Sequence, residues 1–312
     1  MVKNHIKGFW KWFWIAMAGI ILAAIWYFVI TFGLSSYYEK QGNSNYHKEK
    51  YERAIDAYET AITFTPNTAR LYNSLGYTHY MLYEDEKAIN AYNHALELEP
   101  ESVDVNYNLG LLYYEKKEYK KSLNYYNRVL EIKPNDSETL YMVGMLYVEQ
   151  DNFKEAIKNY EKLIISDPKH PYVYNALANA YSSISENEKA KALYLKHIEM
   201  FPEDYIGYTN LYELQLTANK LFDEELKVVY ISSFKEDKNA FIAYEMLKIL
   251  EDISKGKKID MELWKEKYKE ISFGEWRFNK LDTWVDSFEE SQRKDKLKEA
   301  LEIFKSHKVE KN

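Results

Sequence analysis

Hydrophobic and polar positions divide this chain into one long apolar run and a series of short amphipathic segments that come in pairs. Residues 12–34 contain no charged side chain. After them, apolar residues recur at helical spacing in stretches joined by short polar turns. In residues 69–102, Leu71 and Leu75 belong to the first such stretch, and Ile89 and Leu96 belong to the second. The pattern predicts a series of helical hairpins.

The hairpins repeat with a period of 34 residues. Proline closes each unit, because it lacks an N–H group and clashes with the preceding helical turn. Small residues recur in both helices, where we expect the helices to approach closely, and tyrosines recur in the second helix, where we expect them to fill the space between neighbouring units. The four series are Pro66, Pro100, Pro134, Pro168 and Pro202; Gly42, Gly76, Gly110, Gly144 and Ala178; Ala54, Ala88, Ser122, Ala156 and Ala190; and Tyr58, Tyr92, Tyr126, Tyr160 and Tyr194.

This pattern resembles the tetratricopeptide repeat (TPR), whose unit carries an aromatic residue, Leu-Gly, Tyr, Ala, a second aromatic residue and Pro. The second unit, for example, offers Tyr72, Leu75-Gly76, Ala88, Tyr92, Ala95 and Pro100. The resemblance recurs five times over residues 35–204 and continues in a degenerate unit, where Glu236 takes the place of proline. It implies an all-α fold, a right-handed solenoid of helical hairpins.

The expected organisation has four parts. A short cationic tail, residues 1–11, precedes a transmembrane signal-anchor helix, residues 12–34. Six TPR-like units follow at 35–68, 69–102, 103–136, 137–170, 171–204 and, in degenerate form, 205–238. Residues 239–312 lack the repeat and read as a C-terminal helical cap, because terminal units of solenoids need a covered end. Trp264 and Trp276 leave open the alternative that this region is a second docking surface.

The apolar run is long enough to cross a bilayer. As a helix it would span ~34 Å at ~1.5 Å per residue, compared with ~30 Å of hydrocarbon. Aromatic residues flank it as interfacial belts do: Trp10, Trp12 and Trp14 at its start, and Tyr37 and Tyr38 after its end. A cleaved signal peptide and a buried globular helix are the alternatives. The first usually has a shorter apolar region, and the second rarely lacks charge over such a length.

The charge distribution bears on topology and on partners. Lys3, Lys7 and Lys11 precede the run without acidic neighbours, which favours a cytosolic N-terminus and repeats on the extracytoplasmic side. The whole chain carries −7, and residues 1–34 carry +3, so the remainder carries −10. An acidic surface argues against nucleic acid as a partner, because such binding depends on Lys and Arg at phosphates.

The resemblance also implies a place for a partner. In tetratricopeptide proteins the second, fifth, ninth and twelfth positions of each unit face a concave groove. In this sequence the implied partner-binding groove is lined by Arg70, Asn73, Tyr77 and Tyr80; by Tyr107, Leu111 and Tyr114; by Tyr141, Met145 and Val148; and by Tyr172, Asn175 and Asn179. Tyrosine is enriched where proteins meet. The alternative is that tyrosines occur at these positions only because the whole chain is rich in tyrosine, with 30 in all.

One class of partner is disfavoured. Family members that bind the acidic C-terminal tails of chaperones use lysines and arginine around asparagines. Asn108 fits one such asparagine, but the flanking positions hold Asn73, Tyr77, Glu138 and Met142, which carry no positive charge.

Residues for catalysis or for metal binding are not evident in the sequence. The seven histidines lack metal-ligand spacing, and His79 and His197 fall on packing positions. Cysteine is absent, as are a nucleophile elbow and a phosphate-binding Gly-rich loop. We therefore expect no enzyme activity, no catalytic residue, no metal, no cofactor and no small-molecule substrate.

These observations favour a non-enzymatic, membrane-tethered scaffold or adaptor that binds a protein or peptide segment in the groove and helps to assemble a membrane-associated or envelope complex. An obligate structural subunit whose groove is permanently filled is the alternative. An accessory or cryptic enzyme is more remote, since it would need convergent titratable residues in a pocket.

Overall fold

The computed structural model describes residues 2–220, 222–268 and 278–306, and their regular structure is helical throughout. The expected all-α fold built from helical hairpins is confirmed. Contacts divide the chain into two compact units, Met1–Met142 and Val143–Asn312, and each is described by itself. The division falls within α7 (Ser137–Glu149).

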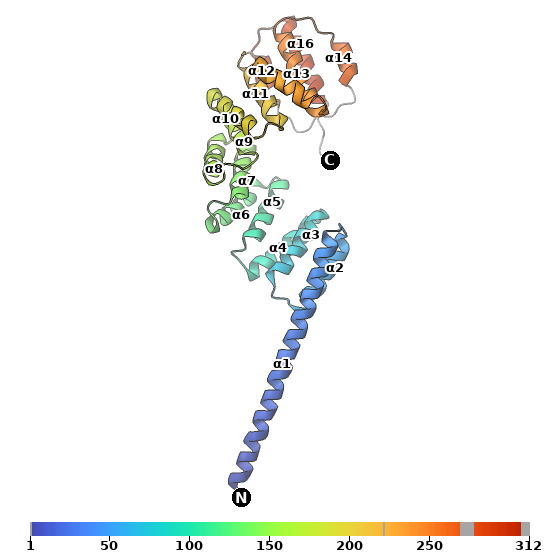
Figure 1. The fold of residues 1–312 in the computed structure, drawn as a ribbon, viewed down its shortest axis with the longest axis vertical. Helices are drawn as coiled ribbons and strands as arrows, with labels where there is room; N and C mark the ends of the chain where they lie inside the picture. The colour runs from blue at the N-terminus through green and yellow to red at the C-terminus, as the bar shows by residue number, and fades with distance from the viewer. Residues whose placement is uncertain (1, 221, 269–277, 307–312) are drawn as a thin grey trace. The chain divides into compact units, whose positions relative to one another are not determined.

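The first unit consists of three hairpins and the start of α7. Each hairpin pairs an A helix with a B helix, and Figure 1 shows them in succession along the blue and cyan part of the chain. The pairs are α1 (Val2–Tyr46) with α2 (Tyr51–Phe64), α3 (Ala69–Met81) with α4 (Asp85–Leu98), and α5 (Val103–Glu115) with α6 (Tyr119–Ile132).

The glycine and tyrosine series form a single packing device. In the four hairpins that have this glycine, the ring of the repeated B-helix tyrosine lies over it, so that a Cβ atom at Gly110 would lie 2.6 Å from Cε1 of Tyr126. We expected these tyrosines to fill the space between neighbouring units, which is only part of their role. Tyr92 does share a core with Val105 and Leu109 of the next hairpin, but its ring also fills the space that glycine leaves within its own.

Helix α1 runs without a break from the apolar segment into the first hairpin (Figure 1). By length and composition it can be a membrane span or a signal sequence, and its apolar stretch is not buried against the protein. The structure therefore differs from the alternative of a buried globular helix. Ser35 is buried, and its hydroxyl lies 2.5 Å from that of Thr65. Tyr38 stacks on Phe64 at 6.0 Å between ring centroids, so it packs within the first hairpin.

The turn inside each hairpin has a shared backbone geometry. One residue adopts the left-handed conformation, with φ between 54° and 63°, although none of the six is glycine. The next N–H group reaches back to a carbonyl five residues earlier, as from Glu84 to His79 at 3.0 Å, which is a Schellman cap of the A helix. The six residues recur every 34 positions: Glu49, Tyr83, Lys117, Asp151, Ser185 and Asn219.

The second unit continues the hairpins and ends in additional helices. The pairs are α9 (Val173–Ser183) with α10 (Asn187–Met200) and α11 (Tyr205–Thr217) with α12 (Glu224–Phe234), preceded by α8 (Phe153–Ser166). The degenerate unit therefore still forms two helices. Residues 218–223 connect them, whereas residues 184–186 suffice in the hairpin before it.

The C-terminal helices share one hydrophobic core with the last hairpins. They are α13 (Lys238–Ser254), α14 (Met261–Tyr268), α15 (Asn279–Asp286) and α16 (Gln292–Ser306). Leu211 and Tyr212 of α11 belong to the same cluster as Leu250 and Trp284. The indole N–H of Trp284 donates to Asn219 at 3.0 Å. This packing is what a cap on the last hairpin requires, whereas Trp276 lies outside the described residues.

Candidate partner-binding surface

The groove positions predicted in the first unit all keep part of their side chains accessible. Arg70 and Tyr77 are exposed, and Asn73, Tyr80, Tyr107, Leu111, Tyr114 and Tyr141 are intermediate. The reason is helical geometry, because the opposite faces of α3 and α5 carry the buried leucines and glycines that pack on the B helices. These positions are therefore available for contact.

Five of the accessible tyrosines form a group that we call the tyrosine strip: Tyr46, Tyr77, Tyr80, Tyr107 and Tyr114. The rings of Tyr46 and Tyr77 lie 5.7 Å apart, and those of Tyr77 and Tyr80 lie 5.9 Å apart. Tyr46 is the residue that the sequence analysis missed. It occupies the twelfth position of the first unit, so extending the position rule to that unit would have found it.

Polar contacts around the strip leave it with an acidic edge. The Tyr80 hydroxyl donates to Glu115 at 2.6 Å. The single cation among the predicted groove positions of the first unit, Arg70, already pairs with Glu39 at 2.7 Å. Asn108 donates its amide to Asn73 at 3.0 Å. The asparagine that fits the chaperone-tail pattern is thus engaged within the protein, and no cation stands at its flanking positions.

Two tyrosines of the strip hold their protons more strongly than an exposed tyrosine does. Burial raises the pKa of Tyr46 and Tyr80 well above the usual range, and hydrogen bonds to Tyr77 and Glu115 respectively raise it further. At physiological pH these side chains are therefore neutral phenols that present a ring and a polar hydroxyl group.

The predicted groove positions in the second compact unit, Val143–Asn312, have a different character. Tyr172 is 58% exposed, and Met145 and Val148 are intermediate. The two asparagines are occupied, since Asn175 accepts from Asn210 at 2.9 Å and Asn179 accepts from the Tyr194 hydroxyl at 2.6 Å. Tyrosine pairs like those of the strip do not link these positions in the described residues.

The hydroxyl groups of the B-helix tyrosines do not all find a partner. Tyr58 donates to Asn43 at 2.6 Å, as Tyr194 does to Asn179. Tyr126 is fully buried, and its hydroxyl has no hydrogen-bond partner among the described residues.

The family matches agree with this geometry. The TPR repeat family matches residues 42–82 and 84–117, and the tetratricopeptide repeat family matches residues 103–136, 137–170 and 171–204. Together these matches cover more than half of the chain. The chain belongs to the tetratricopeptide repeat family. No curated protein matches it over its sequence.

Solved structures share the TPR fold with this chain. A tetratricopeptide repeat protein from Parabacteroides merdae has a TM-score of 0.61 at 18% identity, over 88% of this chain and 99% of its own. The pilF protein of Pseudomonas aeruginosa has a TM-score of 0.59 at 17% identity, over 70% and 98%. The MamA protein has 0.50 at 22%, over 55% and 93%. At these identities the likeness concerns the fold.

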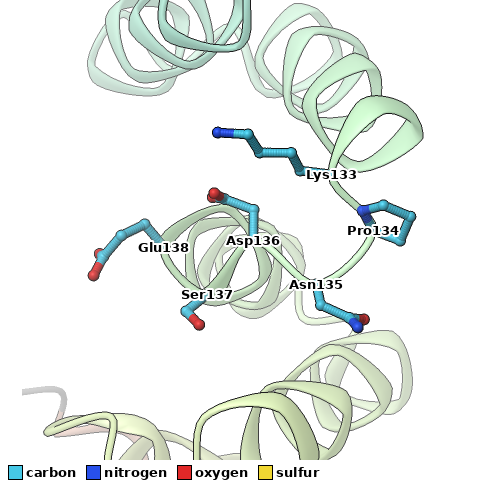
Figure 2. Close-up of a pocket in the computed structure, with 6 residues that line it drawn as sticks. All are labelled: Lys133, Pro134, Asn135, Asp136, Ser137 and Glu138. Atoms are coloured by element: carbon cyan, nitrogen blue, oxygen red, sulfur yellow. The ribbon is translucent and has the colours of Figure 1, made fainter.

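Surface hollows in the first unit of this TPR protein lie outside the strip. One of about 550 Å³ surrounds the turn before α7, where Lys133, Asp136 and Glu138 project to the same side (Figure 2). Asp136 caps α7 by accepting from the Thr139 N–H at 3.0 Å. The capping and charged side chains that line this hollow are typical of a solvated turn between repeats.

A second hollow of about 600 Å³ lies between α2, α3 and α4. Its lining includes carboxylates of α2, such as Glu52 and Asp56, and His94 of α4. Nevertheless, no group of three or more His, Asp or Glu side chains in the described part of the chain could hold a metal ion. His79 and His197 are buried beside Glu84 and Asp204, as expected for packing positions.

Proposed function

We propose that this protein is a non-enzymatic, membrane-tethered scaffold that binds a protein or peptide segment on the tyrosine strip and the adjoining groove positions. The observation that carries this proposal is the accessibility of the strip. The B-helix tyrosines that recur every 34 residues are almost completely buried, whereas Tyr77 is 36% exposed and its neighbours remain partly accessible. A fold that buries so many tyrosines leaves this group partly at the surface, and three of its rings, those of Tyr46, Tyr77 and Tyr80, are in contact.

The nature of the strip suits protein binding. Tyrosine offers a large apolar ring at a low cost in side-chain entropy, together with one hydrogen-bonding tip, and it is enriched at binding hot spots. A high tyrosine content alone would scatter tyrosines over the surface without bringing their rings into contact. The ring contacts from Tyr46 to Tyr77 and on to Tyr80 argue for a continuous contact surface.

The tether is α1. We propose that its apolar part stays in the membrane, with a cytosolic N-terminus and the repeats on the extracytoplasmic side, which rests on the three unneutralised lysines before the apolar run. Holding the strip at one membrane raises the effective concentration of the bound partner there. Such a scaffold would help to assemble a membrane-associated or envelope complex.

Replacing Tyr77, Tyr107 and Tyr141 together by alanine tests this proposal. Alanine preserves helix propensity, so circular dichroism should show unchanged helicity. Crosslinking in the native membrane should then no longer capture the proteins that the wild-type chain captures.

The matched control is Tyr83→Ala. Tyr83 is 92% exposed but lies on the turn between α3 and α4 and is not one of the five tyrosines of the strip. This variant should capture the same proteins as the wild type. Unchanged capture by the triple variant would show that the strip is not the binding surface.

A further inference from the structure

The buried hydroxyl of Tyr126 lacks a partner for a reason that the repeat makes visible. In the first and fifth hairpins, the ninth position of the repeat is asparagine. Asn43 accepts a hydrogen bond from the Tyr58 hydroxyl, and Asn179 accepts one from the Tyr194 hydroxyl. In the third hairpin the same position is Leu111, which cannot accept a hydrogen bond. A buried hydroxyl without a partner is unfavourable. Here it remains unsatisfied within the protein's own residues.

The surroundings of this hydroxyl belong to the tyrosine strip. Burial raises the pKa of Tyr126, and the neighbouring Tyr107, Tyr114, Tyr80 and Glu115 raise it further. The Tyr107 ring lies 5.5 Å from that of Tyr126. Leu111, Tyr107 and Tyr114 are all partly exposed, so rotation of their side chains can open a path to the hydroxyl.

The local charge is negative. Glu115 accepts from the Tyr80 hydroxyl and is close enough to Tyr126 to contribute to its raised pKa. Glu138 and Asp136 are close enough to raise the pKa of Tyr107, after the larger effect of its burial. Arg70 is already paired with Glu39. The site therefore offers hydrogen-bond acceptors, aromatic faces and carboxylates.

We propose that the third hairpin holds a subsite for an arginine side chain of the bound segment. This inference rests on the proposed function, since it assigns the partner that the tyrosine strip binds. The guanidinium group donates to the Tyr126 hydroxyl and to Glu115 and lies against the rings of Tyr107 and Tyr114. Arginine fits better than lysine, because its planar group stacks on aromatic rings, presents five donors and is less strongly hydrated.

The experiment uses the full chain in lipid nanodiscs and a library of random dodecapeptides. Arginine should be enriched among the peptides that bind. The tightest arginine-bearing peptide is then compared with versions in which lysine, or the uncharged isostere citrulline, replaces that arginine. Each replacement should weaken binding about tenfold or more.

Two variants address the subsite directly. Leu111→Asn gives the Tyr126 hydroxyl the acceptor that Tyr58 and Tyr194 have, and Tyr126→Phe removes the hydroxyl. Both should weaken the arginine peptide about tenfold without lowering the unfolding temperature, because neither removes an existing hydrogen bond. The matched control, Tyr194→Phe, should leave peptide binding unchanged, because its hydroxyl is bonded to Asn179.

Failure of this inference can be distinguished from failure of the proposed function. Peptides that bind the strip without any preference for arginine, or that bind Leu111→Asn and Tyr126→Phe as tightly as the wild type, would overturn the arginine subsite alone. If the variant with alanine at Tyr77, Tyr107 and Tyr141 binds the selected peptides like the wild type, the strip itself is not the site.

Discussion

At the scale of single residues, the hairpin turns contain backbone strain that a substitution can relieve. An L-residue in the left-handed conformation costs ~1–2 kcal/mol, and glycine avoids this cost at the expense of chain entropy. Ser185 has a φ of 63° and is exposed. Ser185→Gly should therefore raise the free energy of unfolding by about 0.5–1 kcal/mol. Urea unfolding followed by circular dichroism measures this change.

Ser183→Gly is the matched control, because it makes the same substitution two residues earlier, at the end of α9. In a helical conformation, glycine should lower the free energy of unfolding by up to about 1 kcal/mol. Equal effects of the two substitutions would mean that the left-handed turn carries no strain. The sequence could not reveal this turn, because Glu49, Tyr83, Lys117, Asp151, Ser185 and Asn219 share no chemical property that favours it.

At the scale of elements, α1 couples the apolar segment to the first hairpin. Ser35 pairs with Thr65, directly after α2, and Tyr38 stacks on Phe64 at the end of α2. A chain that starts at Ser35 retains these contacts and loses the apolar run. It should therefore be soluble, helical and cooperative in unfolding, whereas the full chain should remain with membranes after an alkaline carbonate wash.

Protease added to intact cells tests the sidedness of the same element. With the proposed topology it should degrade the repeats and leave the N-terminal tail protected, and the chain that starts at Ser35, if kept in the cytosol, should resist it. If the protein expressed from the full-length sequence is instead found soluble and without residues 1–34, the apolar segment is a cleaved signal sequence. Repeats that resist protease on intact cells would reverse the orientation.

At the scale of the whole molecule, buried tyrosines make stability sensitive to alkaline pH. Burial raises the pKa of Tyr58 and of Tyr244 from 10.0 to about 12. Above pH 10 the unfolded chain loses these protons while the folded chain keeps them, so the unfolded state becomes relatively more stable. The free energy of unfolding should be insensitive to this ionisation below pH 10 and should fall between pH 10 and pH 12.

Absorbance of tyrosinate, measured together with circular dichroism, tests this expectation. The buried tyrosines of the 34-residue series should ionise in step with the loss of helix. Ionisation of all 30 tyrosines near pH 10 in a chain that is still helical would contradict the burial of the tyrosine series.

Much of the fold could be read from the order of residues because its determinants are local. Proline at the end of each B helix and apolar residues at helical spacing act over a few positions, so α3 and α4 fall within residues 69–102 as the periodicity predicts. The limits of the degenerate unit were harder to read. Residues 218–223 connect α11 to α12, and nothing in their spacing announces the longer connection.

The candidate site could be located from the sequence only as a set of positions. The rule for the second, fifth, ninth and twelfth positions selects accessible residues in both units, and their role in binding stays a prediction. Which of them are already engaged could not be foreseen. Asn73, Asn175 and Asn179 accept hydrogen bonds from residues 15 to 35 positions away.

The sequence by itself determined the period, the register and the helical hairpins, because each depends on residue properties at fixed local spacing. The tertiary structure decided what those residues do. It set four of the tyrosine rings on the glycines of their own hairpins, made α1 continuous through the end of the apolar run, and left the Tyr126 hydroxyl without a partner. These outcomes depend on which side chains meet across two packed helices, and a single residue's identity does not specify its neighbour there.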